Sequence, residues 1–125
     1  TGEVMDAELL GYIDALVLDG GELVVHEHKT AAKKWSQTRL ANDMQATFYQ
    51  WATNASRVQF NVLMKTVKPR VDRWVVERSD DEIKEALHVA VSVLKAQKAG
   101  IAFPRRDWHC KGCEFRQACD SRGPL

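Results

Sequence analysis

A glycine turn near the start of the chain places the tightest constraint on the fold. The tripeptide Asp19-Gly20-Gly21 separates two runs, residues 8–18 and 22–30, that are rich in strand-forming residues. Glycines supply the positive φ angles that tight hairpin turns need. The sequence therefore predicts an antiparallel β-hairpin at the beginning of the fold.

The return strand carries an unusual polar run, His26-Glu27-His28-Lys29. Successive side chains of a strand point to opposite faces, so Glu27 and Lys29 share one face and the two histidines share the other. We therefore expect His26 and His28 to pack or hydrogen-bond beneath a helix, away from Glu27.

The length of the turn decides where Asp14 lies relative to Glu27. With Gly20-Gly21 as a two-residue loop, Asp14 falls directly opposite Glu27, and with Asp19-Gly20 as the loop it falls diagonal to it. A three-residue loop would send Asp14 to the histidine face. Either two-residue loop therefore predicts that the two carboxylates share a face.

Two carboxylates side by side on a sheet repel each other unless a cation lies between them. Asp14 and Glu27 offer hard oxygen ligands, which suit Mg²⁺ or Mn²⁺. Lys29 next to such an ion can orient a water molecule or stabilise developing negative charge. An ordinary polar hairpin with surface charges is the alternative interpretation.

The remainder of the chain predicts a mixed α/β fold in the order β-β-α-β-β-α. We expect a helix from Ser36 to about Asn54, strands over 57–66 and 70–77, and a second helix from the capping box at 79–82 to Gly100. The first helix has an apolar stripe that predicts its core face: Leu40, Met44, Phe48 and Trp51. Gln45 and Tyr49, four residues apart, flank this stripe and can point toward the hairpin.

Composition favours one soluble domain. The chain has 125 residues, 45% of them hydrophobic, and a net charge of +1. We expect a cytoplasmic protein, since no apolar run is long enough to span a bilayer. The charge balance neither requires nor excludes a nucleic-acid partner, because a local basic groove can lie within a balanced whole.

The C-terminal segment 101–125 is expected to be irregular and carries a cysteine motif, C-x2-C-x5-C, at Cys110, Cys113 and Cys119. Closely spaced thiols in such a chain favour metal ligation over a disulfide. An iron–sulfur cluster needs four thiolates, whereas zinc can take three cysteines and His109. The spacing leaves both open, together with three unligated cysteines.

Basic residues form two groups that can line a path for phosphates. A solvated surface is the alternative for each of them. The groups comprise Lys29, Lys33, Lys34 and Arg39, and then Arg105, Arg106, Lys111 and Arg116.

Taken together, these motifs resemble the PD-(D/E)XK nuclease superfamily, in particular its RecB-like exonuclease branch with a C-terminal iron–sulfur motif. AddB-type helicase-nucleases and CRISPR-adaptation nucleases share this layout. The matching segments, in order, are "GYID" (11–14), "EHKT" (27–30), "QATFY" (45–49) and "FPRRDWHCKGCEFRQAC" (103–119).

The resemblance implies a restriction-endonuclease-like core and a metal-dependent deoxyribonuclease acting in DNA repair, recombination or phage DNA processing. Asp14, Glu27 and the backbone carbonyl of His28 would bind Mg²⁺ or Mn²⁺, and Lys29 would position the hydrolytic water. Gln45 and Tyr49 would support the site and contact the DNA backbone. The three cysteines would supply three of the four thiolates of a four-iron four-sulfur cluster, with zinc as the alternative.

Relatives also carry an N-terminal helical part with the first cluster cysteine, which this chain lacks. We therefore expect residues 1–125 to be a single nuclease domain or its C-terminal part, completed by the rest of a parent protein or joined to a helicase. Two non-catalytic functions remain as alternatives. One is a DNA-binding or scaffold module with a degenerate site and a zinc-stapled tail, and the other is a zinc-ribbon-like interaction module.

Overall fold

The predicted β-hairpin is present, in the register expected for a Gly20-Gly21 loop. In the computed structural model, which describes residues 5–121, it consists of β1 (Ala15–Asp19) and β2 (Glu22–Ala31). Asp19 pairs with Glu22, so Gly20-Gly21 is the two-residue loop. The φ angles of these glycines, 58° and 82°, are the positive values that a type I′ turn requires.

The first strand is shorter than expected, because residues 8–14 lie outside the ladder. The backbone N–H of His28 faces the β1 side of β2, where residue 13 would continue the pairing. The N–H instead donates to the Asp14 carboxylate at 2.7 Å. This side-chain hydrogen bond replaces the ladder, and backbone pairing therefore begins only at Ala15.

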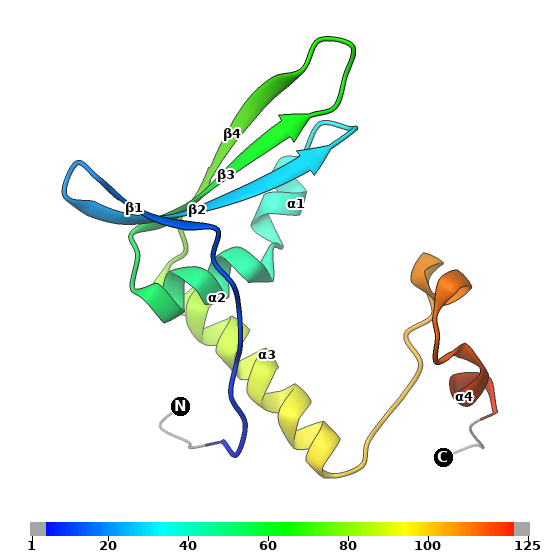
Figure 1. Cartoon of the computed structure of the whole chain (residues 1–125). Coiled ribbons are helices and arrows are strands. Elements are labelled where there is room, and N and C mark those ends of the chain that lie inside the picture. Colours follow the sequence, from blue (N-terminus) through cyan, green and yellow to red (C-terminus); the bar gives the residue numbers. More distant parts are fainter. Residues whose placement is uncertain (1–4, 122–125) are drawn as a thin grey trace. The chain divides into compact units, whose positions relative to one another are not determined.

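Four strands form one mixed sheet in the order β1-β2-β3-β4 (Figure 1). β3 (Arg57–Met64) runs parallel to β2, and β4 (Arg70–Val76) runs antiparallel to β3. A parallel pair needs a crossover connection, which here contains α1 (Gln37–Ala41) and α2 (Met44–Thr53). The predicted β-β-α-β-β-α order is confirmed, except that the first helix is divided.

The division of that helix occurs at Asn42-Asp43. The side chain of Asp43 caps α2 by accepting from the N–H of Ala46 at 2.8 Å, so a new helix starts here. The break rotates the second helix, and the predicted core face is wrong for α2. Its buried residues are Ala46, Thr47 and Gln50, whereas Met44 and Trp51 are 43% and 45% exposed.

The hydrophobic core lies between one face of the sheet and the two crossover helices (Figure 1). The rings of Trp35 and Phe60 pack against each other in this core in a tilted arrangement, with their centroids 5.2 Å apart. The buried apolar residues of this core are Val25, Trp35, Leu40, Ala46, Ala55, Val58, Phe60, Val62, Met64 and Val76. Glu27 lies on the same face of β2 as Val25, so the sheet directs a carboxylate toward the core side.

The last helix of the first unit follows the predicted capping box. The Ser79 N–H donates to Glu82 at 2.8 Å, and the Glu82 N–H donates to the Ser79 hydroxyl at 3.3 Å, before α3 (Asp80–Lys98). The chain divides into two compact units, residues 1–92 and 93–125, and α3 contributes to both. Among the described residues, no helix combines the length and the apolar character needed to cross a membrane.

The cysteine-bearing segment is more regular than expected. It contains a 3-10 helix, η1 (Trp108–Gly112), and a short helix, α4 (Arg116–Asp120). The Asp107 carboxylate starts η1 by accepting from the N–H of Trp108 at 2.7 Å. Asp120 on α4 pairs at 2.5 Å with Arg106, which precedes η1, and at 3.3 Å with Arg116 of the same helix.

Candidate metal centre

Asp14 and Glu27 are joined through their backbones. The N–H of Asp14 donates to Glu27 Oε1 at 3.1 Å, and the N–H of His28, the residue after Glu27, donates to Asp14 Oδ2 at 2.7 Å. These two hydrogen bonds hold the Asp14 carboxylate against β2 and the Glu27 carboxylate against the residue that precedes β1. The structure therefore brings the two predicted acidic residues together where β1 begins.

Glu27 is the most deeply buried charged residue of the site. Its side chain is 2% exposed, and within residues 5–121 it has a lysine but no arginine as an ion-pair partner. Burial raises the pKa of the Glu27 carboxyl, and the nearby Asp14 carboxylate raises it as well, against the opposing effects of the Asp14 N–H and Lys29. A carboxylate in this position carries a desolvation penalty that a bound cation would offset.

Lys29 approaches the other side of the Glu27 carboxylate. Its Nζ lies 3.7 Å from Glu27 Oε2, and its side chain is 33% exposed. The ammonium group thus reaches both the buried carboxylate and solvent. This is the position that a residue needs if it is to hold a water molecule beside a bound cation.

The backbone carbonyl of His28 faces the same place. The N–H and C=O of one residue in a strand point to the same neighbouring strand, and the His28 N–H points to Asp14. Two carboxylates and one carbonyl make a set of hard oxygen donors. Such a set fits Mg²⁺ or Mn²⁺ rather than zinc, which prefers nitrogen and sulfur.

Tyr49 connects α2 to the segment before Asp14. Its hydroxyl donates to the backbone carbonyl of Tyr12 at 2.6 Å, and Gln45 donates to that hydroxyl at 3.1 Å. Gly11 permits the contact, because a methyl group there would lie only 2.7 Å from Cε1 of Tyr49. Gln45 and Tyr49 therefore support the backbone two residues from Asp14.

His26 and His28 lie on the opposite face of β2 from Glu27, as expected from the alternation. Their Nδ1 atoms lie 3.2 and 3.4 Å from the side-chain nitrogen of Asn61 on β3. Gln59 in turn donates to Asn61 at 2.8 Å. Hydrogen bonding across two strands thus accounts for both rings, whereas a helix was expected to cover them.

The predicted basic residues have different surroundings in the two units. Lys33, Lys34 and Arg39 are exposed, and the guanidinium of Arg39 lies 4.1 Å from the ring centroid of Trp35. In the second unit, Arg105 is exposed and Arg106 is paired with Asp120.

The three cysteines lie in and beside η1 and α4. Within residues 5–121, no three side chains of histidine, cysteine, aspartate or glutamate converge as metal ligands, and all three thiols are free. Cys110 makes local contacts instead, accepting from the N–H of Asp107 at 3.4 Å. The described residues therefore give no support to the expected iron–sulfur or zinc site.

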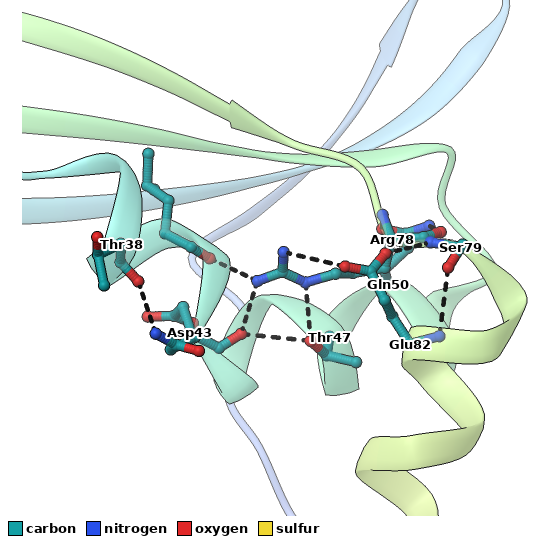
Figure 2. Close-up of polar contacts among 9 residues, drawn as sticks. Thr38, Asp43, Thr47, Gln50, Arg78, Ser79 and Glu82 are labelled. Carbon is teal, nitrogen blue, oxygen red and sulfur yellow. Dashed lines mark hydrogen bonds and ion pairs between the residues drawn. The ribbon is translucent and has the colours of Figure 1, made fainter.

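A buried arginine that contacts α2, the helix of Tyr49, was not predicted. Arg78, between β4 and α3, is 9% exposed and contacts both crossover helices (Figure 2). The sequence signal was an arginine directly before the capping box, at the end of a strand. The capping box explains Ser79 and Glu82 without Arg78, so nothing in the pattern indicated its burial.

Comparison with known proteins identifies this arrangement. The family model of the PD-(D/E)XK nuclease superfamily matches residues 2–120. The crystal structure of SSO0001 is similar with a TM-score of 0.61 and 22% identity, covering 90% of this chain and 51% of that one. The chain thus spans about half the length of SSO0001 and shares its fold.

A second solved structure is more distant. It is a candidate exonuclease from Eubacterium rectale, with a TM-score of 0.41 and 17% identity, covering 82% of this chain and 43% of that one. At this distance it does not bear on the fold assignment. No curated protein matches the sequence significantly.

Proposed function

The chain belongs to the PD-(D/E)XK nuclease superfamily, and we propose that it is a metal-dependent deoxyribonuclease domain of the RecB-like exonuclease type. The observation that carries the proposal is the burial of the Glu27 carboxylate beside Asp14. A polar hairpin with no further role would not keep two carboxylates together at the edge of the core.

We assign a role to each residue from the oxygen or nitrogen atom that it presents at the site. Asp14, Glu27 and the His28 carbonyl would hold Mg²⁺ or Mn²⁺, which supplies Lewis-acid chemistry to phosphodiester hydrolysis when bound. Lys29 orients the attacking water, because its Nζ lies beside Glu27 and is open to solvent. Tyr49, whose hydroxyl accepts from Gln45, donates to the Tyr12 carbonyl and thereby positions the segment that leads to Asp14.

DNA is the proposed substrate, and its phosphates would follow the exposed cations of the first unit. Lys33 and Lys34 follow the end of β2, the strand that carries Lys29, and Arg39 lies in α1 on the same connection. The proposed setting is DNA repair, recombination or phage DNA processing. An additional part of the parent protein or a helicase would be the partner.

A DNA-cleavage assay tests the proposal. The full chain is incubated with Mn²⁺ and end-labelled single- and double-stranded DNA, and Glu27→Ala and Lys29→Ala are compared with Glu77→Ala and Lys65→Ala. Glu77 and Lys65 are exposed residues of the same unit, so they control for loss of charge. Wild type and both controls should cleave DNA, whereas the two site variants should lose about 100-fold or more of the rate.

Two results would contradict the assignment. Cleavage that survives Glu27→Ala would place the chemistry elsewhere. A wild-type chain that binds DNA and manganese without cleaving would favour the non-catalytic scaffold.

For the cysteines we propose metal ligation completed from outside the chain. The resemblance supports this, together with the N–H contact that Asp107 makes to the Cys110 sulfur. Metal analysis and an absorption spectrum of anaerobically purified protein test it. One zinc without iron would contradict the iron–sulfur form, and the absence of both metals would contradict ligation by this chain.

A further inference from the structure

Arg78 is a buried cation that touches neither Asp14, Glu27 nor Lys29, yet it contacts the helix that supports them. We propose that Arg78 is a positioning residue of the nuclease centre. It holds α2 in the place where Tyr49 meets the Tyr12 carbonyl. This inference rests on the proposed function and deepens it.

The guanidinium fills the break between α1 and α2. Its Nη2 donates to the carbonyl of Leu40 at 2.5 Å and to that of Asp43 at 3.2 Å (Figure 2). These carbonyls lie on either side of the junction, where helical hydrogen bonding is interrupted. Arg78 therefore binds one carbonyl on each side of the break, beside the weaker bonds of 3.3 Å that these carbonyls accept from the Asp43 N–H and the Thr47 hydroxyl, and so links the two helices.

Two side chains of α2 complete the attachment. Arg78 Nε donates to the Thr47 hydroxyl at 3.0 Å, and the Gln50 amide bonds both the N–H and the carbonyl of Arg78, at 2.8 and 3.0 Å (Figure 2). Thr47 and Gln50 are 6% and 7% exposed. These buried polar contacts, and not the apolar stripe predicted from the sequence, connect α2 to the end of β4.

The same helix carries Tyr49, whose hydroxyl contacts the Tyr12 carbonyl at 2.6 Å. Tyr12 lies two residues before Asp14. A continuous series of contacts therefore runs from Arg78 through α2 and Tyr49 to the segment that presents the Asp14 carboxylate. A shift of α2 by even a fraction of its pitch would move the Tyr49 hydroxyl away from that carbonyl.

Arginine is suited to this position by its shape. Its planar fork reaches Thr47, Leu40 and Asp43 with separate N–H groups, whereas the single ammonium of lysine cannot reach all three. Arg78→Lys thus preserves the charge and removes the geometry. It is the most informative variant, with Arg73→Lys on the exposed side of β4 as its matched control.

The first measurement is amide hydrogen exchange by NMR on the full chain, which needs no nuclease activity. Arg78→Lys should accelerate exchange at the N–H groups of Asp14 and His28 about tenfold, with little change at Phe60 in the central strand β3. Arg73→Lys should leave all three unchanged. Equal acceleration at all three sites, or none at Asp14, would overturn the positioning role.

The second measurement is single-turnover DNA cleavage in a double-mutant cycle with Tyr49→Phe. Arg78→Lys should lower the maximal rate about tenfold or more and change the half-saturating DNA concentration less than twofold. In the Tyr49→Phe background its effect should shrink to less than threefold, because both changes break the same connection. Fully additive effects would show that Arg78 acts only on general stability.

Thr47→Val provides a milder variant if Arg78→Lys does not fold. It removes one acceptor of the guanidinium and should change exchange at Asp14 in the same direction. Failure of the nuclease proposal can be distinguished from failure of the positioning role proposed for Arg78. A wild-type chain without cleavage contradicts the proposed function, whereas the exchange pattern tests Arg78 independently.

Discussion

The carboxylate of Asp14 accepts a hydrogen bond of 2.7 Å from the backbone N–H of His28, in the place where a longer first strand would have paired. With this contact β1 begins only at Ala15, and the Asp14 carboxylate is held beside Glu27. At this position the His28 N–H bonds an acidic side chain and not the backbone of a neighbouring strand.

Glu27 should destabilise the metal-free protein at neutral pH. Because folding raises the pKa of its carboxyl, the native state binds more protons than the unfolded state above the ordinary pKa of 4.5. Stability contributed at this group therefore falls as the pH rises from about 4.5 through the folded pKa. Glu27→Gln should raise the melting temperature at about pH 7 and leave it nearly unchanged at about pH 4.

Thermal unfolding followed by circular dichroism in EDTA checks this pH dependence. Glu77→Gln, which removes an exposed carboxylate of the same unit, is the matched control. It should leave the melting temperature unchanged at both pH values. A Glu27→Gln variant that is less stable than wild type at about pH 7 would mean that the carboxylate is satisfied without a cation.

Gly11 should be intolerant of a side chain. Since a methyl group at this position would lie 2.7 Å from Tyr49 Cε1, Gly11→Ala has to displace the ring and lengthen the hydrogen bond from Tyr49 to Tyr12. We expect a loss of about 1–3 kcal/mol in the free energy of unfolding, measured with urea. Gly112→Ala, whose methyl group would meet open space, is the control.

The same pair of variants separates function from stability. Gly11→Ala should also lower the rate of DNA cleavage under conditions where it is fully folded. Normal cleavage by a folded Gly11→Ala protein would contradict a supporting role for Tyr49.

Arg57 should stabilise the register of the hairpin. Its guanidinium pairs with Asp19 at 2.8 Å and contacts Glu22, the two residues that flank the glycine turn. Because these partners are largely exposed, Arg57→Met should lower the free energy of unfolding by only about 1 kcal/mol or less, and high salt should reduce the difference. Urea unfolding at low and high salt measures it, with Arg73→Met as control, and a salt-independent loss would argue against the ion pairs.

Much of the fold followed from local patterns in the sequence. The glycine turn, the alternation of the strands and the Ser79–Glu82 capping box each depend on neighbouring residues, and the structure confirms them. The face shared by Glu27 and Lys29 followed from strand geometry in the same way.

The failures arise where side chains interrupt or replace backbone hydrogen bonds, and several of these contacts join residues distant in sequence. The continuous helix expected over 36–54 is broken because Asp43 caps a second helix and Arg78 accommodates the break. Periodicity could not identify a core face that depends on the hydrogen bonds of Thr47 and Gln50 to a residue about 30 positions away. Similarly, no pattern indicated that the side chain of Asp14 would replace the start of β1.

Manganese binding tests the central claim most directly. Calorimetric titration of the full chain with Mn²⁺ should show one site, and Asp14→Asn and Glu27→Gln should each weaken its affinity by at least about tenfold, whereas Glu77→Gln should not. Binding that remains at wild-type affinity in both site variants would contradict a metal-dependent nuclease centre built on Asp14 and Glu27.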